Sequence, residues 1–186
     1  MRLTPLFTTL ALALTTGFAA TSPHTPPDQI DTSAFAAKGR VRKGLQFERR
    51  VDASPAQVFN AWTTEDGVRA FLDIDSKIEL EIGGAYELYL QDENPIGERG
   101  SEECQILSYV PGRMLSFTWN APPSFPIARQ ARTWIVLTFE PAEDGKTLVR
   151  VDHLGFGDGG SWPQVKQYFR RAWASTLDRL AEHFAG

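Results

Sequence analysis

The strongest candidate for chemistry in this chain is His153, in the segment KTLVRVDHLGF at residues 146–156. Polar and apolar residues alternate there, which predicts a β-strand whose side chains point to opposite faces in turn. Val149, Val151 and His153 then share one face, which we expect to look inward. A histidine on that face could be a general acid or base, a polar contact for a ligand, or a hydrogen-bonded core group. The residue types leave these three roles open.

A second candidate region is the stretch TWNAPPSFPIARQARTW, residues 118–134, in which two tryptophans bracket a proline-rich loop. Strand alternation places Leu115, Phe117 and Trp119 on one face, so we expect Trp119 to face an interior cavity. Trp134 falls on the opposite face of its own strand. A tryptophan at a pocket mouth offers a large rigid surface with a polar tip, although ordinary packing is an equal alternative. The prolines disfavour a helix and predict a stiff rim.

Arginines near this loop and in the C-terminal segment could also bind a ligand. Four of them could meet if the loop folds over that segment: Arg129, Arg132, Arg170 and Arg171. A pair of arginines can bind a carboxylate through two parallel hydrogen bonds. Alternatively, these side chains are solvated or pair with acids such as Glu140 and Asp178.

Other reactive groups give weaker signals. Glu102 and Glu103 are neighbours in a strand-like segment, so they should face opposite ways and cannot act on one atom. Cys104, the single cysteine, allows no internal disulfide and is expected to be buried and inert. The three histidines lack the spacing of metal ligands, and the glycines of residues 155–160 lack the lysine of a phosphate loop. We therefore expect no metal and no cofactor, and we read residues 155–160 as a flexible turn.

The beginning of the chain differs from the rest. Arg2 gives a positive start, residues 6–18 are mostly apolar, and small residues precede a cleavage point after Ala19. This pattern predicts a secretory signal peptide at residues 1–19, too short for a stable membrane span. The proline-rich residues 20–40 predict a linker or arm, and residues 41–186 the domain. We expect export to a bacterial periplasm or to the medium.

The charge balance bears on the partners. Nineteen basic and 23 acidic side chains give a formal net charge of −4, without a basic run. Nucleic acids and anionic lipid surfaces both select for basic patches, so neither is an expected partner. Because the residue directly after the predicted cleavage site is not a cysteine, we expect no lipid anchor. The expected partner is a small molecule, and a protein partner stays open.

Capping signals mark three predicted helices. Ser54, with Pro55 and Gln57, begins the first, and Thr64 begins the second. Ser161 opens SWPQ and predicts the start of the third. Apolar residues then recur every three or four positions, which predicts one long amphipathic helix. They are Val165, Phe169, Trp173, Leu177, Leu180 and Phe184.

The remaining segments predict strands that follow one another through tight turns. The predicted strands are residues 45–53, 77–82, 85–90, 101–110, 113–119, 132–141 and 146–156. Turn residues at 83–84, 111–112 and 142–145 separate successive pairs, as in an antiparallel meander. The expected fold class is therefore α+β, with a curved antiparallel sheet of about six to seven strands wrapped around the long C-terminal helix. One helix cannot fill a wide concave sheet, so we also expect an internal cavity.

These segments resemble a known superfamily. The opening FERRVDASPAQVFNAWTTEDGVRAFL resembles that of START-like (SRPBCC) proteins, whose helix-grip fold is shared with Bet v 1 proteins and polyketide cyclases. EIGGAYEL, PGRMLSFTW, TLVRVDHLGFGDG and AWASTLDRL are similar to the branch named for the activator of heat-shock-protein-90 ATPase. The resemblance covers residues 44–184 and implies a ligand-holding cavity, but not one activity.

The expected function is binding of a small hydrophobic or amphipathic ligand by an exported helix-grip protein. The residues expected in the cavity wall are Tyr86, Phe117, Trp119, His153, Phe169 and Trp173. Two alternatives stay open. One is a cyclase, hydrolase or isomerase that uses His153, although binding is favoured over catalysis. The other is a chaperone-like interaction module whose proline-rich loop docks a protein through an exposed Phe125.

Overall fold

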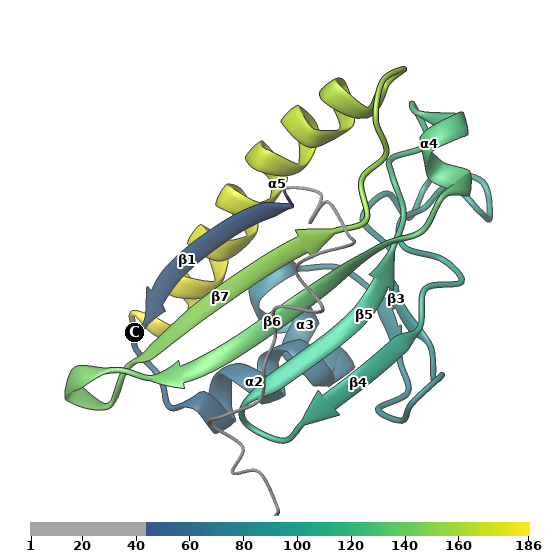
Figure 1. Ribbon diagram of the computed structural model, residues 1–186. Helices are drawn as coiled ribbons and strands as arrows, with labels where there is room; N and C mark the ends of the chain where they lie inside the picture. Colours follow the sequence, from purple (N-terminus) through teal and green to yellow (C-terminus); the bar gives the residue numbers. More distant parts are fainter. Residues whose placement is uncertain (1–43) are drawn as a thin grey trace, which may run out of the picture. The chain divides into compact units, whose positions relative to one another are not determined.

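The computed structural model describes residues 44–186 (Figure 1). The predicted signal peptide, residues 1–19, and the predicted arm, residues 20–40, lie outside the described residues. All described residues belong to the predicted domain, residues 41–186. Residues 44–186 are therefore the part of the chain in which the structure bears on the sequence predictions.

An antiparallel sheet of five strands forms one layer, in the spatial order β1-β7-β6-β5-β4. Its strands are β1 (Leu45–Val51), β4 (Ile106–Val110), β5 (Met114–Trp119), β6 (Thr133–Pro141) and β7 (Thr147–Leu154). A second sheet pairs β2 (Ser76–Ile78) with β3 (Tyr86–Leu88), and an isolated bridge from Ala85 to Gln105 links this hairpin to the segment before β4. The seven strands match the predicted number.

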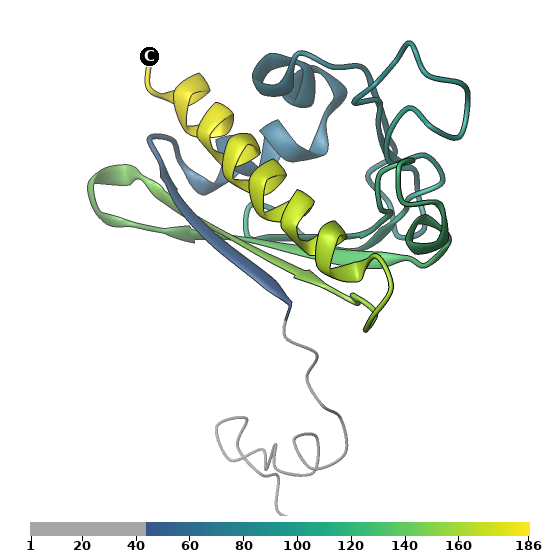
Figure 2. The ribbon, with the colours of Figure 1, turned by 90° about the horizontal axis from the view of Figure 1, so that it is seen from above.

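The main helices all cover the same face of the five-stranded sheet, as Figure 2 shows from above. The helical elements are α2 (Pro55–Thr63), α3 (Glu65–Leu72), α4 (Pro126–Gln130), the short 3-10 turn η2 (Glu143–Gly145) and α5 (Trp162–Phe184). The long α5 crosses the curved sheet, with α2 and α3 beside it. This arrangement confirms the predicted α+β class and the long helix gripped by the sheet.

The inward faces of the strands follow the predicted alternation. Leu115, Phe117 and Trp119 on β5 are buried, and so is His153 on β7. Trp134 on β6 is 41% exposed on the opposite face, as predicted. Burial follows the alternation because the helices within residues 44–186 cover one face of the sheet.

Two of the three predicted helix caps are present. Ser54 and Gln57 form a reciprocal capping box at α2, and the Thr64 hydroxyl accepts a bond from the Gly67 N–H at 3.0 Å. The predicted cap at Ser161 is wrong, because its side chain bonds no backbone N–H and its own backbone is already helical. Capping needs an extended residue at this point, whereas the chain enters α5 through glycines with positive φ.

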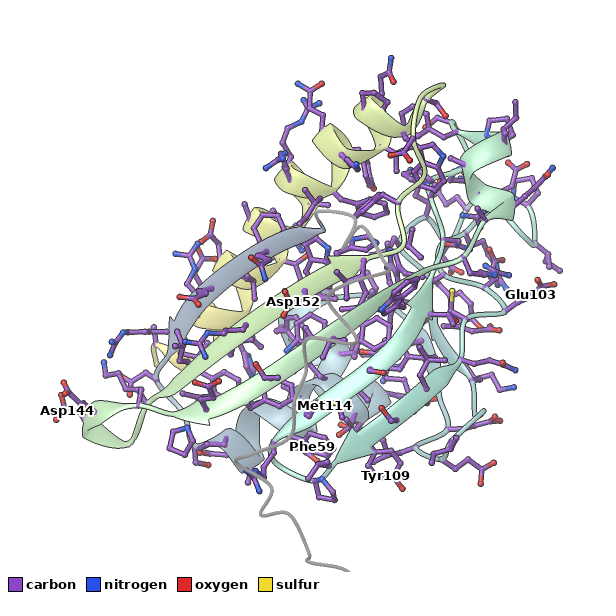
Figure 3. All side chains as sticks on the ribbon, in the orientation of Figure 1. Phe59, Glu103, Tyr109, Met114, Asp144 and Asp152 are labelled. Atoms are coloured by element: carbon purple, nitrogen blue, oxygen red, sulfur yellow. The ribbon has the colours of Figure 1, made fainter. Side chains whose placement is uncertain are left out.

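Three predicted strands are much shorter than expected, and one of them is residues 85–90, of which only Tyr86–Leu88 form a strand. The predicted strand 77–82 ends at Ile78, and residues 79–82 form an irregular connection. The predicted strand 101–110 is regular only from Ile106. Glu103, which points away from the domain in Figure 3, adopts a left-handed conformation with φ of 61°. The neighbouring Glu102 carboxylate accepts the backbone N–H groups of Gly97, Arg99 and Gly100. These bonds close a turn where alternation alone predicts a strand.

The glycine-rich segment after β7 has a packing role. Gly155 has φ of +84°, and a side chain there would meet the ring of Trp134. A side chain on Gly157 would overlap the indole of Trp162, the first residue of α5. The predicted turn is present, and its glycines leave space for two tryptophans.

Candidate functional site: a pocket beside the C-terminal helix

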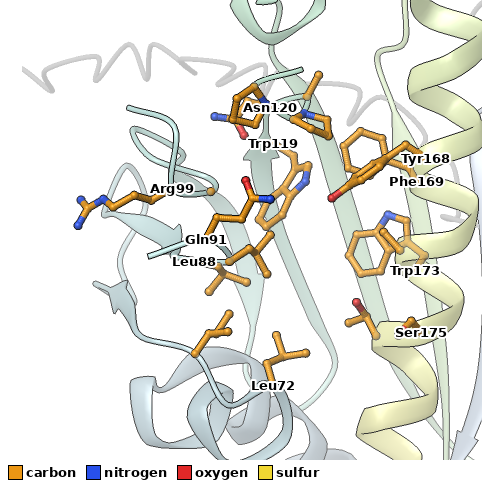
Figure 4. Close-up of a pocket in the computed structure, with 18 of the residues that line it drawn as sticks. Leu72, Leu88, Gln91, Arg99, Trp119, Asn120, Tyr168, Phe169, Trp173 and Ser175 are labelled. Atoms are coloured by element: carbon orange, nitrogen blue, oxygen red, sulfur yellow. The ribbon is translucent and has the colours of Figure 1, made fainter. Parts of the chain in front are cut away.

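A pocket of about 610 Å³ opens between α5, the end of β5 and the loops that follow β3 and β5 (Figure 4). The volume is within the range of pockets that bind small molecules. One side is formed by Leu72, Leu88, Phe117 and Trp119, and the facing side by Tyr168, Phe169, Trp173 and Thr176 of α5. Residues 90–100 and 120–124 contribute its rim, which includes Leu90, Asn94, Gly100, Pro122 and Ser124.

Two neighbouring faces of α5 have different surroundings. The predicted apolar stripe is buried at Val165, Phe169, Trp173, Leu177 and Leu180. A second stripe lines the pocket with mainly small or polar residues, at Tyr168, Ala172, Ser175, Thr176 and Arg179. Sequence reasoning missed this stripe. Its signal is the spacing of four, seven, eight and eleven positions from Tyr168, which puts all five side chains on one helix face.

Aromatic rings make the apolar part of the pocket wall. Phe117 and Trp119 lie edge to face with centroids 5.6 Å apart, and Trp62 lies 6.2 Å from Trp173. In Figure 4 the rings of Trp119 and Trp173 face each other across the pocket. Such rings offer large rigid surfaces to an apolar ligand.

Four of the six residues predicted for the wall line this pocket. They are Phe117, Trp119, Phe169 and Trp173. Tyr86 lies behind them, stacked on Phe117 with centroids 4.1 Å apart, and its hydroxyl donates to the carbonyl of Trp62 at 2.9 Å. Burial raises the pKa of Tyr86 above its ordinary value. Tyr86 therefore supports the wall from behind.

His153 also lies behind the wall, fully buried and bonded through both ring nitrogens. The indole N–H of Trp173 donates to His153 Nδ1 at 3.1 Å, since an indole nitrogen can only donate. The neutral ring then carries its proton on Nε2 and donates to Thr133 Oγ1 at 2.9 Å. Thr133 in turn donates to the carbonyl of Trp119 at 3.0 Å. One network thus joins the indole of Trp173 to the backbone of Trp119 on the other side of the pocket.

The surroundings of His153 keep it neutral. Burial lowers its pKa to about 3, and the rings of Phe156 and Phe169 lie 4.4 and 4.5 Å from the imidazole. Its only lone pair on nitrogen already accepts the Trp173 N–H. An acid or base needs a free site and a pKa near the working pH. This geometry therefore suits orientation of Trp173 better than proton transfer.

A network around Arg129 joins the two rim segments. Its guanidinium donates to the carbonyls of Ala121, Gly97 and Gly100 and lies 3.4 Å from a Glu102 carboxylate oxygen. Glu102 also accepts from Arg99 Nε at 3.0 Å. Burial alone would raise the pKa of Glu102, but the backbone N–H groups of Gly97, Arg99 and Gly100 and the Arg99 side chain outweigh it and lower that pKa. The rim is therefore tied together by a largely buried ionic network.

The arginine pairings differ from those predicted. Of the four arginines, Arg129 lines the pocket and Arg132 pairs with Glu103 at 2.9 Å, whereas Arg170 and Arg171 are exposed on α5. The proposed acidic partners bind elsewhere: Glu140 to Arg150, and Asp178 to Arg49. The first pair forms between the neighbouring strands β6 and β7 and the second between α5 and β1, and residue types alone do not indicate either.

The loop of residues 118–134 forms part of the rim and contains a helix that was not predicted. α4 begins at Pro126, because proline suits the first turn of a helix, where its missing N–H costs nothing. Phe125 packs partly buried against the core, so it is not the expected exposed anchor. The neighbouring Ile127 is exposed instead.

The remaining candidates are passive in this structure. Burial raises the pKa of the Cys104 thiol to about 11, which makes it a poor nucleophile. Within residues 44–186, no group of three or more histidine, cysteine or acidic side chains could bind a metal ion. No helix in that range is long and apolar enough to cross a membrane.

Most of the described chain matches a known protein family. The model of a family described as "Activator of Hsp90 ATPase homolog 1-like protein" matches residues 52–185. No curated protein matches the chain significantly.

Solved structures share the fold at low sequence identity. MLL2253 of Mesorhizobium loti is 18% identical, with a TM-score of 0.57 over 75% of this chain and 95% of that one. CalU16 of Micromonospora echinospora is 21% identical, with a TM-score of 0.57 over 76% of each chain. PFC0360w of Plasmodium falciparum, described as an HSP90 activator, is 12% identical, with a TM-score of 0.56 over 72% and 89%. At these identities the likeness extends to the fold alone.

Proposed function

The chain belongs to the activator of Hsp90 ATPase homolog 1-like family, and we propose that this member is an exported protein that binds a small hydrophobic or amphipathic molecule beside α5. The observation that carries the proposal is the pocket of about 610 Å³ between the facing rings of Trp119 and Trp173. Small side chains at Ala172 and Ser175 leave space that a bulky residue would fill.

Apolar burial would supply most of the affinity. A ligand that buries about 300 Å² of apolar surface gains roughly 7 kcal/mol, from which the cost of association is subtracted. The ring of Trp173 is held by its hydrogen bond to His153, and the ring of Trp119 packs against Phe117, so both lose little freedom on binding. Polar groups such as Asn120 and Thr176 would then orient the ligand.

The test is binding of a neutral apolar dye, N-phenyl-1-naphthylamine, followed by its fluorescence. Ala172→Phe places a ring in the pocket, and we expect it to weaken dye binding at least about tenfold, since it fills the space the dye needs. Ala174→Phe is the matched control, because Ala174 is exposed on the same helix outside the pocket wall. Equal dye affinity in both variants and the parent protein would contradict the proposal.

Export is the second half of the proposal and is supported by the charge and apolar pattern of residues 1–19. Expression of the full chain in a bacterium, followed by fractionation and N-terminal sequencing, tests it. We expect a mature chain that begins at Ala20 and is recovered outside the cytoplasm. A chain lacking residues 2–19 is the control and should stay in the cytoplasm. Recovery of the full chain in the cytoplasm as well, with residues 1–19 still attached, would contradict export.

The two alternative functions have less support from the geometry. A catalytic role would need His153 in the pocket wall, whereas it lies behind Trp173 with both nitrogens bonded. A docking role through Phe125 would need that ring to be exposed, whereas it packs against the core. Neither alternative is therefore proposed for this site.

A further inference from the structure

The charged residues of the pocket wall all have the same sign. Among residues 44–186 they are Arg99, Arg129 and Arg179, and no aspartate or glutamate of that range lines the pocket. The whole chain nevertheless has a formal net charge of −4. A positive pocket in an acidic protein favours a ligand with negative charge.

The three arginines are not equivalent. Arg99 and Arg129 are both bonded to Glu102, and Arg99 also lies 3.8 Å from an Asp92 carboxylate oxygen, so two acids compensate their charge. Arg179 has no acidic partner among residues 44–186, and its one hydrogen bond runs from Nη1 to the carbonyl of Leu72 at 3.2 Å. A guanidinium has five N–H donors, so most of those on Arg179 are available to a ligand.

The surroundings of Arg179 suit a head group. Ser175 and Thr176 precede it by four and three residues on the pocket side of α5, so two hydroxyls lie next to its side chain. The aromatic wall formed by Phe169 and Trp173 lies farther towards the N-terminus of the same helix. Tyr168 and Arg179 are separated by eleven residues, or roughly 16 Å along the helix axis. One face of α5 thus has a polar, positive end and an aromatic end.

We infer that the ligand is an anionic amphiphile, whose carboxylate or phosphate head binds Arg179 and whose apolar body lies between Trp119 and Trp173. The inference rests on the proposed function and specifies the class of ligand. Arginine binds either head group through parallel charge-assisted hydrogen bonds. Ser175 and Thr176 can donate further bonds to the same oxygens.

Probes with one alkyl chain and different heads test the inference. Dodecanoate, dodecyl phosphate, dodecan-1-ol and dodecylamine are titrated below their micellar concentrations at about pH 8, with intrinsic tryptophan fluorescence as the readout. Three tryptophans, Trp62, Trp119 and Trp173, line the pocket. We expect at least one anionic probe to bind about tenfold more tightly than the alcohol, and the amine to bind no better than the alcohol.

Variants then assign the charge effect to one residue. Arg179→Gln should abolish the advantage of the anionic probes over dodecan-1-ol. Arg179→Lys, which keeps the charge without the planar fork, should retain part of the advantage. Arg170→Gln is the matched control, because Arg170 is exposed on α5 outside the pocket wall. Thermal unfolding of each variant verifies that it is folded.

The outcomes separate this inference from the proposed function. If alcohol and anionic probes bind equally and Arg179→Gln changes neither, the inference is wrong while the pocket still binds hydrophobic ligands. If the anionic advantage is lost in Arg99→Gln but kept in Arg179→Gln, the assignment to Arg179 is wrong. If no probe, including the neutral dye, binds the folded protein, the proposed function fails and the inference fails with it.

Discussion

Two neighbouring faces of α5 differ in what they do for the molecule. The buried stripe, Val165, Phe169, Trp173, Leu177 and Leu180, packs into the core. The pocket stripe, Tyr168, Ala172, Ser175, Thr176 and Arg179, borders the open space. The two stripes meet at the edge of the pocket. There Phe169 and Trp173 of the buried stripe belong to the core and also line the pocket.

The contrast shows how one helix can both stabilise a fold and leave space for a ligand. Large apolar side chains on the first stripe bury surface against the sheet, which stabilises the domain. The small side chains of the second stripe, Ala172, Ser175 and Thr176, bury less surface and leave the space beside α5 unfilled. The residues that stabilise the fold and those that shape the pocket should therefore respond differently to substitution.

The largest expected effect tests the buried stripe. Leu177→Ala removes a side chain that is 1% exposed and should lower the free energy of unfolding by about 2–5 kcal/mol, through lost burial and a cavity. Thr176→Ala, one position away on the pocket stripe, should cost less than about 1 kcal/mol. Urea denaturation of both variants measures the difference. Equal costs would show that the two stripes are not distinct.

The next effect tests the rim opposite α5. Arg129→Met leaves Glu102 without one of its charged partners, and both side chains are largely buried, at 14% and 8% exposed. We expect a loss of about 3 kcal/mol and faster amide exchange in residues 97–102. Arg132→Met, whose partner Glu103 is exposed, should cost less than about 1 kcal/mol. A loss from Arg132→Met as large as that from Arg129→Met would contradict this view of the rim.

A pH experiment tests the residue behind the wall. Because the folded pKa of His153 is about 3 and its unfolded pKa is near 6.5, the unfolded state binds the proton first as pH falls. His153 should therefore remove stability between pH 6.5 and 3, by up to about 1.4 kcal/mol per pH unit. His153→Gln should show a shallower decline over this range, measured by urea denaturation at several pH values. His183→Gln, on the exposed end of α5, is the matched control for the loss of a histidine.

The smallest effect compares two helix starts. Ser54→Ala removes a capping box and should destabilise the domain by about 1 kcal/mol. Ser161→Ala, at the start of α5, should cost a few tenths of a kcal/mol at most, because its side chain bonds no backbone N–H there. Thermal unfolding compares the two variants. A larger loss from Ser161→Ala would show that this serine caps α5 in solution.

Local patterns predicted the parts of the site that depend on local geometry. The period of two on β5 placed Phe117 and Trp119 inward, and the period of three to four on α5 placed Phe169 and Trp173 inward. Whether an inward-facing side chain reaches the pocket or lies behind its wall was not predictable in this way. Tyr86 and His153 also point inward, but Phe117 and Trp173 lie between them and the pocket.

The sequence alone determined the fold class, the order of the elements, most turns and the inward faces. These features depend on residues close together in the chain, whose propensities and periodicity are visible without a structure. Only the tertiary structure decided that His153 supports Trp173, that Glu102 joins Arg99 to Arg129, and that Arg179 borders the pocket with no acidic partner among residues 44–186. The physical reason is that burial, charge compensation and empty space depend on segments far apart in sequence that meet only when the chain folds.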